Sequence, residues 1–435
     1  MTSSILSLFL YIATILAGLY LDYTTCYKLG KFPAKRVKKI RRLYLIWLYV
    51  FLCFGYMTGS DWRSYELTYV YGVGIDRFLS EPISWFVFTV FPKIIPDFVL
   101  FMGIAKCLYL FSVYKLVSTI TDRWVSVLAL LIPFKLSFML IQNPFRFMLA
   151  LIIVNFAFRY LYLYLTEPGW KRTKTVLLVF GLTLLSVLVH NSCVVFLPLV
   201  LVSFLVPSIS KVNTFVLFIL YIVFAVFTSN LSFINELKEN AIFFIQNYME
   251  MSDYASYESE DNEAIWSIGN LLRILFFFFI LRSKDQICCL YKNGSIVYGF
   301  SVLYLFLSRL LVLIPTGFRL TLPFMVFYVI IIIYMWMYKR SLKEISSVNT
   351  EAPMNNYSVM RLKGITSRPL IPLFALIIIS YSLLSFGRKA WTSYDILPYS
   401  NSIPYFAVGH KSYNERSQYN LDAYQARLGI QYEHE

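Results

Sequence analysis

The sequence predicts an all-α, polytopic integral membrane protein. Hydrophobic residues make up 58% of its 435 residues and charged residues only 14%, whereas soluble globular domains carry roughly 25% charged residues. Apolar segments of roughly 20 residues, the length that an α-helix needs to cross a bilayer, recur along most of the chain. An ordinary soluble enzyme is excluded, because the chain lacks the charge to cover a water-exposed surface.

About twelve apolar segments are candidates for membrane spans. They are residues 3–22, 43–58, 97–118, 124–141, 145–165, 174–189, 192–207, 213–230, 265–281, 296–314, 318–337 and 369–387. Segment 83–96 is broken by Pro92 and Pro96, so we expect an interfacial or re-entrant helix there. A polar interruption at His190 divides 174–207, which predicts either a hairpin of two short helices or one long helix with a break.

Lysine and arginine residues predict the orientation, because cytoplasmic connections carry an excess of them. Residues 23–42 hold eight basic residues and no acid, 166–174 hold three, and 338–368 hold six basic residues and two acids. We expect these connections in the cytoplasm. Segment 231–264, with eight acids and one base, should be external, as should both termini. The net charge of +15 therefore indicates topology and not nucleic acid as a partner.

The predicted domain organisation is simple. Residues 1–387 form a transmembrane domain with external loops 59–96 and 231–264, and residues 388–435 form an external tail. The six cysteines fall in or beside apolar segments without metal-ligand spacing, so they indicate small buried side chains. No motif for a nucleotide, a metal or another cofactor occurs, and none is expected.

Four arginines stand out near one end of four predicted helices. A charge at the centre of a membrane helix costs about 3 kcal/mol or more, so such residues are functional candidates. Arg146, Arg273, Arg309 and Arg319 are all expected at the external level. A guanidinium grips phosphate oxygens with two parallel hydrogen bonds, which favours a bound polyanion. The alternative is separate pairing with headgroup phosphates or loop carboxylates.

Other charges inside apolar segments are Lys106, Lys135 and Arg159. The long side chains of Lys135 and Arg159 could equally extend to the headgroup region. These residues therefore carry a weaker functional prediction than the four arginines.

Two further polar groups are site candidates. Asp61 and Arg63 lie among aromatic residues that include Tyr65, a pattern suited to sugars, although an interfacial Trp/Tyr belt would look the same. His190, followed by Asn191, lies near the predicted outer face. A single histidine is more often a structural hydrogen-bond donor than a catalyst, and it has no acidic neighbour in the sequence.

Several of these segments together resemble a known family. The matching segments are Gly59-Ser60-Asp61 followed by Tyr65 and Tyr69, Arg146 within Asn-Pro-Phe-Arg-Phe-Met-Leu-Ala, His190-Asn191-Ser192-Cys193 leading to Phe196-Leu197-Pro198, Gly317-Phe318-Arg319-Leu320, and the Pro398-Tyr399 and Pro404-Tyr405 pairs. They resemble the EpsG family of bacterial exopolysaccharide polymerases, which is related to the Wzy-type O-antigen and capsule polymerases. Phe147 departs from the pattern, since the family commonly has Gln at that position.

The resemblance implies a C-type glycosyltransferase architecture in the bacterial inner membrane. Such enzymes join an undecaprenyl-pyrophosphate-linked oligosaccharide donor to an acceptor at the periplasmic or external face. Membrane lipid and a chain-length regulator are further expected partners.

No Asp-x-Asp metal motif occurs, so arginines would stabilise the pyrophosphate leaving group in place of a metal. The expected substrate-binding residues are Arg63, Tyr65, Arg146, Asn191, Arg273, Arg309 and Arg319. Asp61, and after it His190, is expected to take the proton of the acceptor hydroxyl. The competing interpretations are a lipid-linked oligosaccharide flippase and a membrane acyltransferase, which would favour a histidine paired with an acid.

Overall fold

The computed structural model describes residues 2–27, 34–55, 61–142, 144–228, 236, 268–290, 293–311, 317–337 and 370–392. The elements in these residues are α-helices with short 3₁₀- and π-helical segments. The all-α prediction is therefore confirmed. Segment 231–264 apart from Glu236, segment 338–368 and the tail beyond Thr392 lie outside the described residues.

Several described helices are apolar enough to cross a membrane. Four are long enough by themselves: Ile5–Thr24, Phe98–Ile120, Phe145–Thr166 and Arg319–Trp336. Seven shorter apolar helices accompany them: Pro82–Ile94, Trp124–Phe134, Thr173–Val189, Asn191–Ser203, Thr214–Phe227, Gly294–Leu310 and Pro372–Arg388. The chain is thus a helical membrane protein, and the number of spans stays a prediction.

The described residues fall into two compact units. The first unit comprises Met1–Leu197 with Ile379–Glu435, and the second comprises Pro198–Ile378. The sequence predicted one transmembrane domain over 1–387 and gave no sign of this division.

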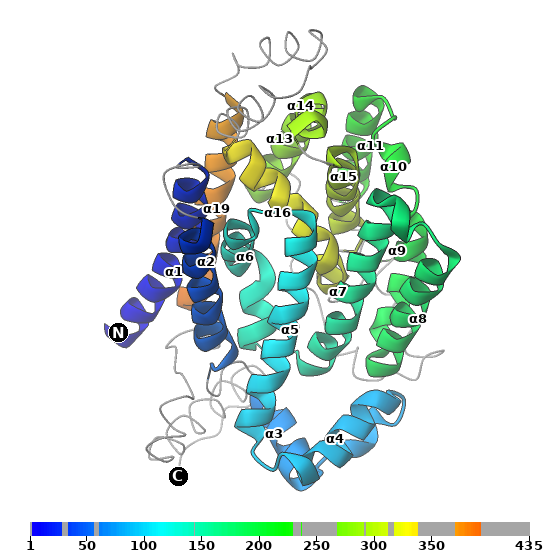
Figure 1. Ribbon diagram of the computed structural model, residues 1–435. Helices are drawn as coiled ribbons and strands as arrows, with labels where there is room; N and C mark the ends of the chain where they lie inside the picture. The colour runs from blue at the N-terminus through cyan, green and yellow to red at the C-terminus, as the bar shows by residue number, and fades with distance from the viewer. Residues whose placement is uncertain are drawn as a thin grey trace. The chain divides into compact units, whose positions relative to one another are not determined.

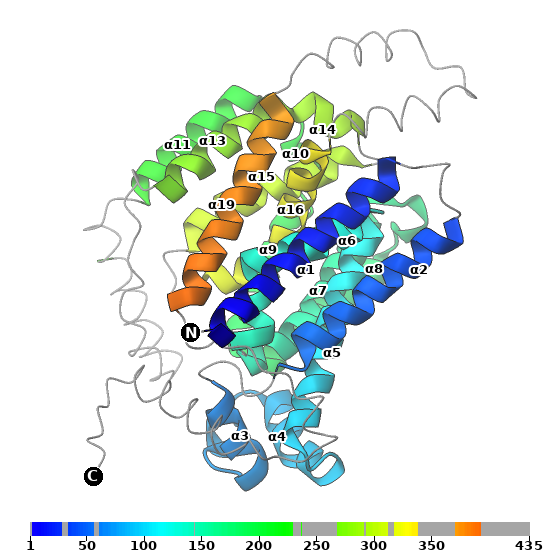
Figure 2. The same cartoon turned by 90° about the vertical axis from the view of Figure 1, so that its left-hand side faces the viewer.

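The first unit is a helical bundle. Its helices are α1 (Thr2–Tyr27), α2 (Ala34–Leu48), α5 (Phe98–Ile120), α6 (Trp124–Leu131), α7 (Phe145–Thr166) and α8 (Thr173–Val189). Successive helices run in alternating directions (Figure 2), and α7 packs against both α5 and α8. Residues 132–136 and 138–142 continue α6 as π-helical turns, η3 and η4.

Polar side chains join α5 and α7 inside this bundle. Asn155 donates to the hydroxyl of Ser112 at 2.9 Å, and Arg159 donates to that of Thr119 at 2.9 Å. Arg159 thus contacts a neighbouring helix. Lys106 of α5 is fully buried, with its Nζ 5.3 Å from the centre of the Trp62 ring.

Basic residues at one end of the bundle belong to a helix. The sequence suggested a connection over 23–42, but α1 extends to Tyr27 and α2 already begins at Ala34. Lysine and arginine are good helix formers, so their charge does not interrupt the helix. Arg41 pairs with the buried Asp22 of α1 at 2.8 Å and donates to the carbonyl of Asp122 at 3.2 Å.

The opposite end carries the segment that the sequence suggested as an external loop. It contains α3 (Trp62–Tyr71), the 3₁₀-helix η2 (Ile75–Phe78) and α4 (Pro82–Ile94). Both views show α3 and α4 side by side at this end (Figures 1 and 2), where α3 contacts α5 and α4 contacts α8. The expected short helix over 83–96 is therefore present, with Pro92 in its last turn.

Three of the four aromatic side chains of α3 face the protein, whereas Tyr71 is 71% exposed. Trp62, Tyr65 and Tyr69 are buried, with exposed fractions of 1%, 9% and 2%. Tyr69 stacks on Phe101 of α5 at 4.4 Å. These three rings pack against the protein interior, and the role of Tyr65 in substrate binding stays a prediction.

The second unit is a separate helical assembly. The described elements wholly within it are α10 (Val206–Ile209), α11 (Thr214–Phe227), α13 (Ile268–Arg282), α14 (Lys284–Leu290), α15 (Gly294–Leu310), η9 (Gly317–Thr321) and α16 (Leu322–Trp336). α9 (Phe196–Ser203) and α19 (Leu370–Thr392) cross the boundaries between the units. Gly299 of α15 permits the close approach of α10, because a Cβ there would overlap the Val206 carbonyl oxygen.

Candidate active site

A buried carboxylate joins three segments at the α3–α4 end of the first unit. Glu81 directly precedes α4, and its side chain is 2% exposed. Its Oε2 lies 2.7 Å from Nη1 of Arg146, and its Oε1 lies 2.6 Å from Nδ1 of His190. The backbone N–H of Asn191 also donates to Oε1 at 3.2 Å. We refer to Glu81, Arg146 and His190 as the Glu81 cluster.

Local structure places each member. Pro82 at the first position of α4 suits a helix start and leaves Glu81 at the N-cap. Arg146 lies in the first turn of α7. His190 adopts an extended conformation that ends α8, and the 3₁₀-helix η6 (Asn191–Val195) follows. The expected break in 174–207 is thus present, and it carries two of the candidate residues.

Two more hydrogen bonds fix α4 against the end of α8. The hydroxyl of Ser84 donates to the carbonyl of Val189 at 2.6 Å, and the side-chain amide of Asn191 donates to the hydroxyl of Ser80 at 3.1 Å. Ser84 is fully buried. Glu81 and His190 are therefore held in register by contacts on both sides of the pair.

The charge state of Glu81 determines the role of the imidazole. Burial acts to raise the pKa of Glu81, but the hydrogen bond and charge of His190, the charge of Arg146 and the Asn191 N–H outweigh it, so the pKa is lowered. An ionised carboxylate only accepts hydrogen bonds. Whenever the ring of His190 is neutral, its proton is therefore on Nδ1, which leaves Nε2 as an acceptor.

The guanidinium of Arg146 contacts three other side chains. It pairs with Glu81, donates to the hydroxyl oxygen of Tyr65, and lies over the ring of Phe78 with its Cζ 4.7 Å from the ring centre. Burial, the largest influence, raises the pKa of Tyr65, so this hydroxyl stays neutral near pH 7. The Nε of Arg146 has no hydrogen-bond partner among the described residues.

The arrangement of His190 and Glu81 is suited to general base catalysis. A histidine whose Nδ1 donates to a carboxylate is oriented to use its Nε2 as a base, and the carboxylate stabilises the imidazolium that forms. The side chain of His190 is 15% exposed, so a reactant can reach it. The guanidinium of Arg146 pairs with the other oxygen of the same carboxylate, Oε2.

A comparison with protein families agrees with the resemblance seen in the sequence. The model of the EpsG family matches residues 4–348. The chain belongs to the EpsG family. This family is associated with polysaccharide polymerases, and the matched range includes the whole Glu81 cluster. None of the curated proteins and none of the solved structures matches the chain.

Four predicted site residues of this EpsG-family protein come together: Tyr65, Arg146, His190 and Asn191. Asp61 directly precedes α3, is partly exposed, and lies close enough for its charge to act on the Tyr65 hydroxyl. The side chain of Arg63 lies outside the described residues.

The remaining three arginines of the EpsG-family protein lie in the second unit. Arg273 of α13 is exposed. Arg309 in the last turn of α15 is 5% exposed, and its Nε and Nη2 have no hydrogen-bond partner among the described residues. Arg319 lies in η9, which packs against α15. That these three arginines line one cavity together with Arg146 stays a prediction.

Sequence reasoning missed Glu81. It treated His190 as lacking an acidic neighbour, whereas the structure supplies a carboxylate 109 positions away. The available signal was an acidic residue directly before a proline, which favours a helix start. That pattern locates the helix but cannot reveal a distant partner. Phe147, the departure from the family pattern, packs its ring against the His190 ring at 5.7 Å.

Arg146 and His190 lie against the two oxygens of the buried Glu81 carboxylate in this EpsG-family site. Within the described ranges, no group of three His, Cys, Asp or Glu side chains is placed to hold a metal ion.

Proposed function

We propose that the protein polymerises lipid-linked oligosaccharide repeat units by glycosyl transfer, with the Glu81 cluster in its active site. Membership of the EpsG family supports polysaccharide polymerisation. The observation that carries the site assignment is the convergence of His190 and Arg146 on one buried carboxylate, at 2.6 and 2.7 Å.

In the proposed reaction His190 is the general base. Its Nε2 takes the proton of an acceptor hydroxyl as that oxygen attacks the anomeric carbon of the donor sugar. The bond from this carbon to the pyrophosphate breaks, and the lipid pyrophosphate leaves with the electron pair. Glu81 is a positioning residue, since it holds the His190 tautomer and offsets the charge of the imidazolium.

Asp61 is the weaker candidate for the base. The sequence placed Asp61 first because it was expected in an external, water-accessible loop, where its carboxylate would stay ionised. What supports His190 is the carboxylate of Glu81, which lies 2.6 Å from its Nδ1 and orients the ring. Asp61 instead suits binding of sugar hydroxyls beside Tyr65.

The leaving group would be undecaprenyl pyrophosphate at the external face of the inner membrane. Developing charge on a pyrophosphate requires cations positioned in advance. Arg309 supports this role, because two of its buried nitrogens have no hydrogen-bond partner among the described residues, and a buried charge without a partner is costly. In this proposal the pyrophosphate is held by Arg273, Arg309 and Arg319. Arg146 mainly forms the ion pair with Glu81.

A membrane acyltransferase is the second candidate. The His190–Glu81 pair is the histidine–acid arrangement that such an enzyme would use, so this observation favours it as well. Family membership favours the polymerase.

The decisive experiment measures surface polysaccharide in a strain that lacks this chain. Single repeat units support the polymerase, loss of export supports a flippase, and full-length but unacylated polymer supports an acyltransferase. Restoration of chain length by the wild-type gene, but not by His190→Ala, links the effect to the Glu81 cluster.

A further inference from the structure

The N-terminal half of α2 presents a dense cationic surface. Six basic residues occupy the eight positions from Lys35 to Arg42. Arg41 turns toward Asp22 of α1, whereas the side chains of Lys35, Lys38, Lys39 and Arg42 are exposed. This surface lies at the end of the first unit opposite the Glu81 cluster (Figure 2).

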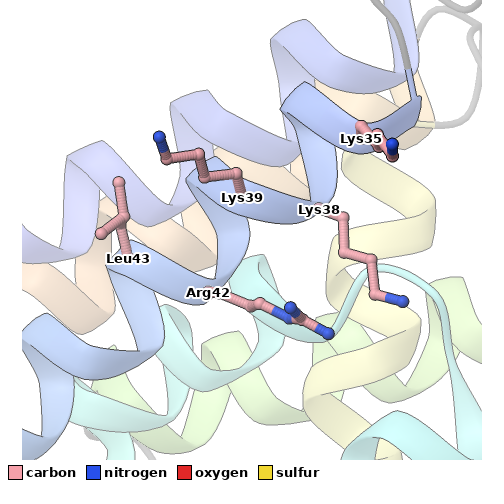
Figure 3. Close-up of a pocket in the computed structure, with 5 residues that line it drawn as sticks. All are labelled: Lys35, Lys38, Lys39, Arg42 and Leu43. Carbon is pink, nitrogen blue, oxygen red and sulfur yellow. The ribbon is translucent and has the colours of Figure 1, made fainter.

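These exposed cations border an open hollow. Its volume is about 340 Å³, and its lining residues are Lys35, Lys38, Lys39, Arg42 and Leu43. Lys38 and Arg42 extend to one side of the helix, whereas Lys39 and Leu43 extend to the other side in this view (Figure 3). Among the described residues, no acidic side chain lines this hollow. Four like charges around one hollow create a positive field that an anion would relieve.

The same face changes from cationic to apolar along the helix. Residues four apart are neighbours on a helix surface, so Lys35, Lys39, Leu43 and Trp47 form one ridge. Lys38, Arg42 and Ile46 form the adjacent ridge. Leu43, Ile46 and Trp47 remain 55%, 56% and 39% exposed. A row of cationic side chains is thus followed directly by an exposed apolar strip.

The change from cationic to apolar side chains along this face of α2 fits one kind of ligand. A soluble anion would use the lysines and Arg42 but leave the apolar strip uncovered. A lipid with an anionic head and hydrocarbon chains would cover both parts. The basic residues also mark this end as the expected cytoplasmic side, where the leaflet is rich in anionic headgroups.

We propose that this face of α2 binds an anionic glycerophospholipid. Its phosphate lies in the hollow between Lys38 and Arg42, and an acyl chain follows Leu43 and Ile46. Four lining cations favour a headgroup with two phosphates over one with a single phosphate. The bound lipid would hold α2 against the bundle, adding to the Arg41–Asp22 pair. This proposal is independent of the proposed catalytic reaction.

The test measures thermal unfolding of the purified full-length protein in detergent. The probes are cardiolipin, phosphatidylglycerol, phosphatidylcholine and inorganic pyrophosphate, each titrated separately. Cardiolipin should raise the unfolding midpoint most and phosphatidylglycerol less, and phosphatidylcholine should leave it unchanged. The shift should shrink in high salt, because salt screens exposed charges.

Matched variants locate the site. Lys38→Gln/Arg42→Gln should weaken the apparent affinity for cardiolipin about tenfold or more. Lys171→Gln/Arg172→Gln removes two other exposed cations from the same predicted side and should keep wild-type affinity. Leu43→Gln/Ile46→Gln should weaken cardiolipin binding but not pyrophosphate binding.

Three outcomes would overturn the proposal. Equal weakening in the two cation-removing variants would mean a general charge effect. A shift from phosphatidylcholine equal to that from cardiolipin would remove the role of the anionic head. A pyrophosphate shift equal to that of cardiolipin, with no effect of Leu43→Gln/Ile46→Gln, would identify a soluble anion as the ligand.

Discussion

Replacing Glu81 with glutamine is expected to abolish polymer formation with only moderate loss of stability. Both carboxylate oxygens accept from donors: Oε1 from His190 and the Asn191 N–H, and Oε2 from Arg146. A glutamine has one acceptor oxygen and one NH₂ donor. In either orientation it places that NH₂ group against an existing donor, so part of the cluster must break.

The expected losses of polymer formation and of stability in Glu81→Gln follow from these contacts. With its NH₂ toward His190, the introduced glutamine would shift the ring proton to Nε2 and remove the base. With its NH₂ toward Arg146, it places a donor against the guanidinium, and in either orientation the neutral amide loses the ion pair and leaves the imidazolium without a counter-charge. General base catalysis contributes about 10²–10⁴-fold, so polymer formation should fall about 100-fold or more. A hydrogen bond to a charged group contributes about 1.5–3 kcal/mol, which sets the expected loss in the free energy of unfolding.

The assay combines polymer length in cells with turnover of a purified lipid-linked repeat unit. Asp76→Asn is the matched control, because Asp76 is an exposed carboxylate on η2 at the same end of the first unit. Its polymer should keep normal length. Normal chain length in Glu81→Gln, with the protein inserted at wild-type level, would refute the positioning role of Glu81.

The other predictions concern pH, the arginine and topology. The lowered pKa of Glu81 contributes stability that is present above its unfolded value, about 4.3, and is lost as pH falls through the lower folded value. The unfolding midpoints of wild type and Glu81→Gln should therefore converge as the pH falls through that folded value. Arg146→Lys keeps the charge but loses the planar contact with Phe78 and the fork of donors, so polymer yield should drop about tenfold or more with normal insertion, and a wild-type yield would contradict the role of the guanidinium. Cysteines introduced in place of Ser252 and Ser346, both outside the described residues, should label from the outside only at position 252, and labelling only at 346 would invert the topology.

Much of the fold was predictable because helix length and apolar composition carry the signal. The expected segments 97–118, 145–165 and 174–189 correspond closely to α5, α7 and α8. The helical region over 62–71 was missed, although Trp62, Tyr65 and Tyr69 repeat at the spacing of a buried helix face. The start of α2 was also missed, because basic residues were interpreted as a connection.

The site was predictable only in part. His190, Asn191, Arg146 and Tyr65 were selected from the sequence, since polar groups beside apolar helices are costly and the family resemblance pointed to them. Their common partner, Glu81, comes from another segment, and only the packing of α4 against α8 brings it there. A local pattern contains no information about such a distant contact.

The most direct test of the proposed mechanism compares His190→Ala with Asp61→Asn in purified protein, with donor binding and polymer formation measured separately. If His190 is the base that Glu81 orients, His190→Ala should bind the lipid-linked donor normally and release only single repeat units. Asp61→Asn should still form polymer of near-normal length. Normal chain length in His190→Ala, or loss of polymer with normal donor binding only in Asp61→Asn, would contradict the assignment of His190 as the base.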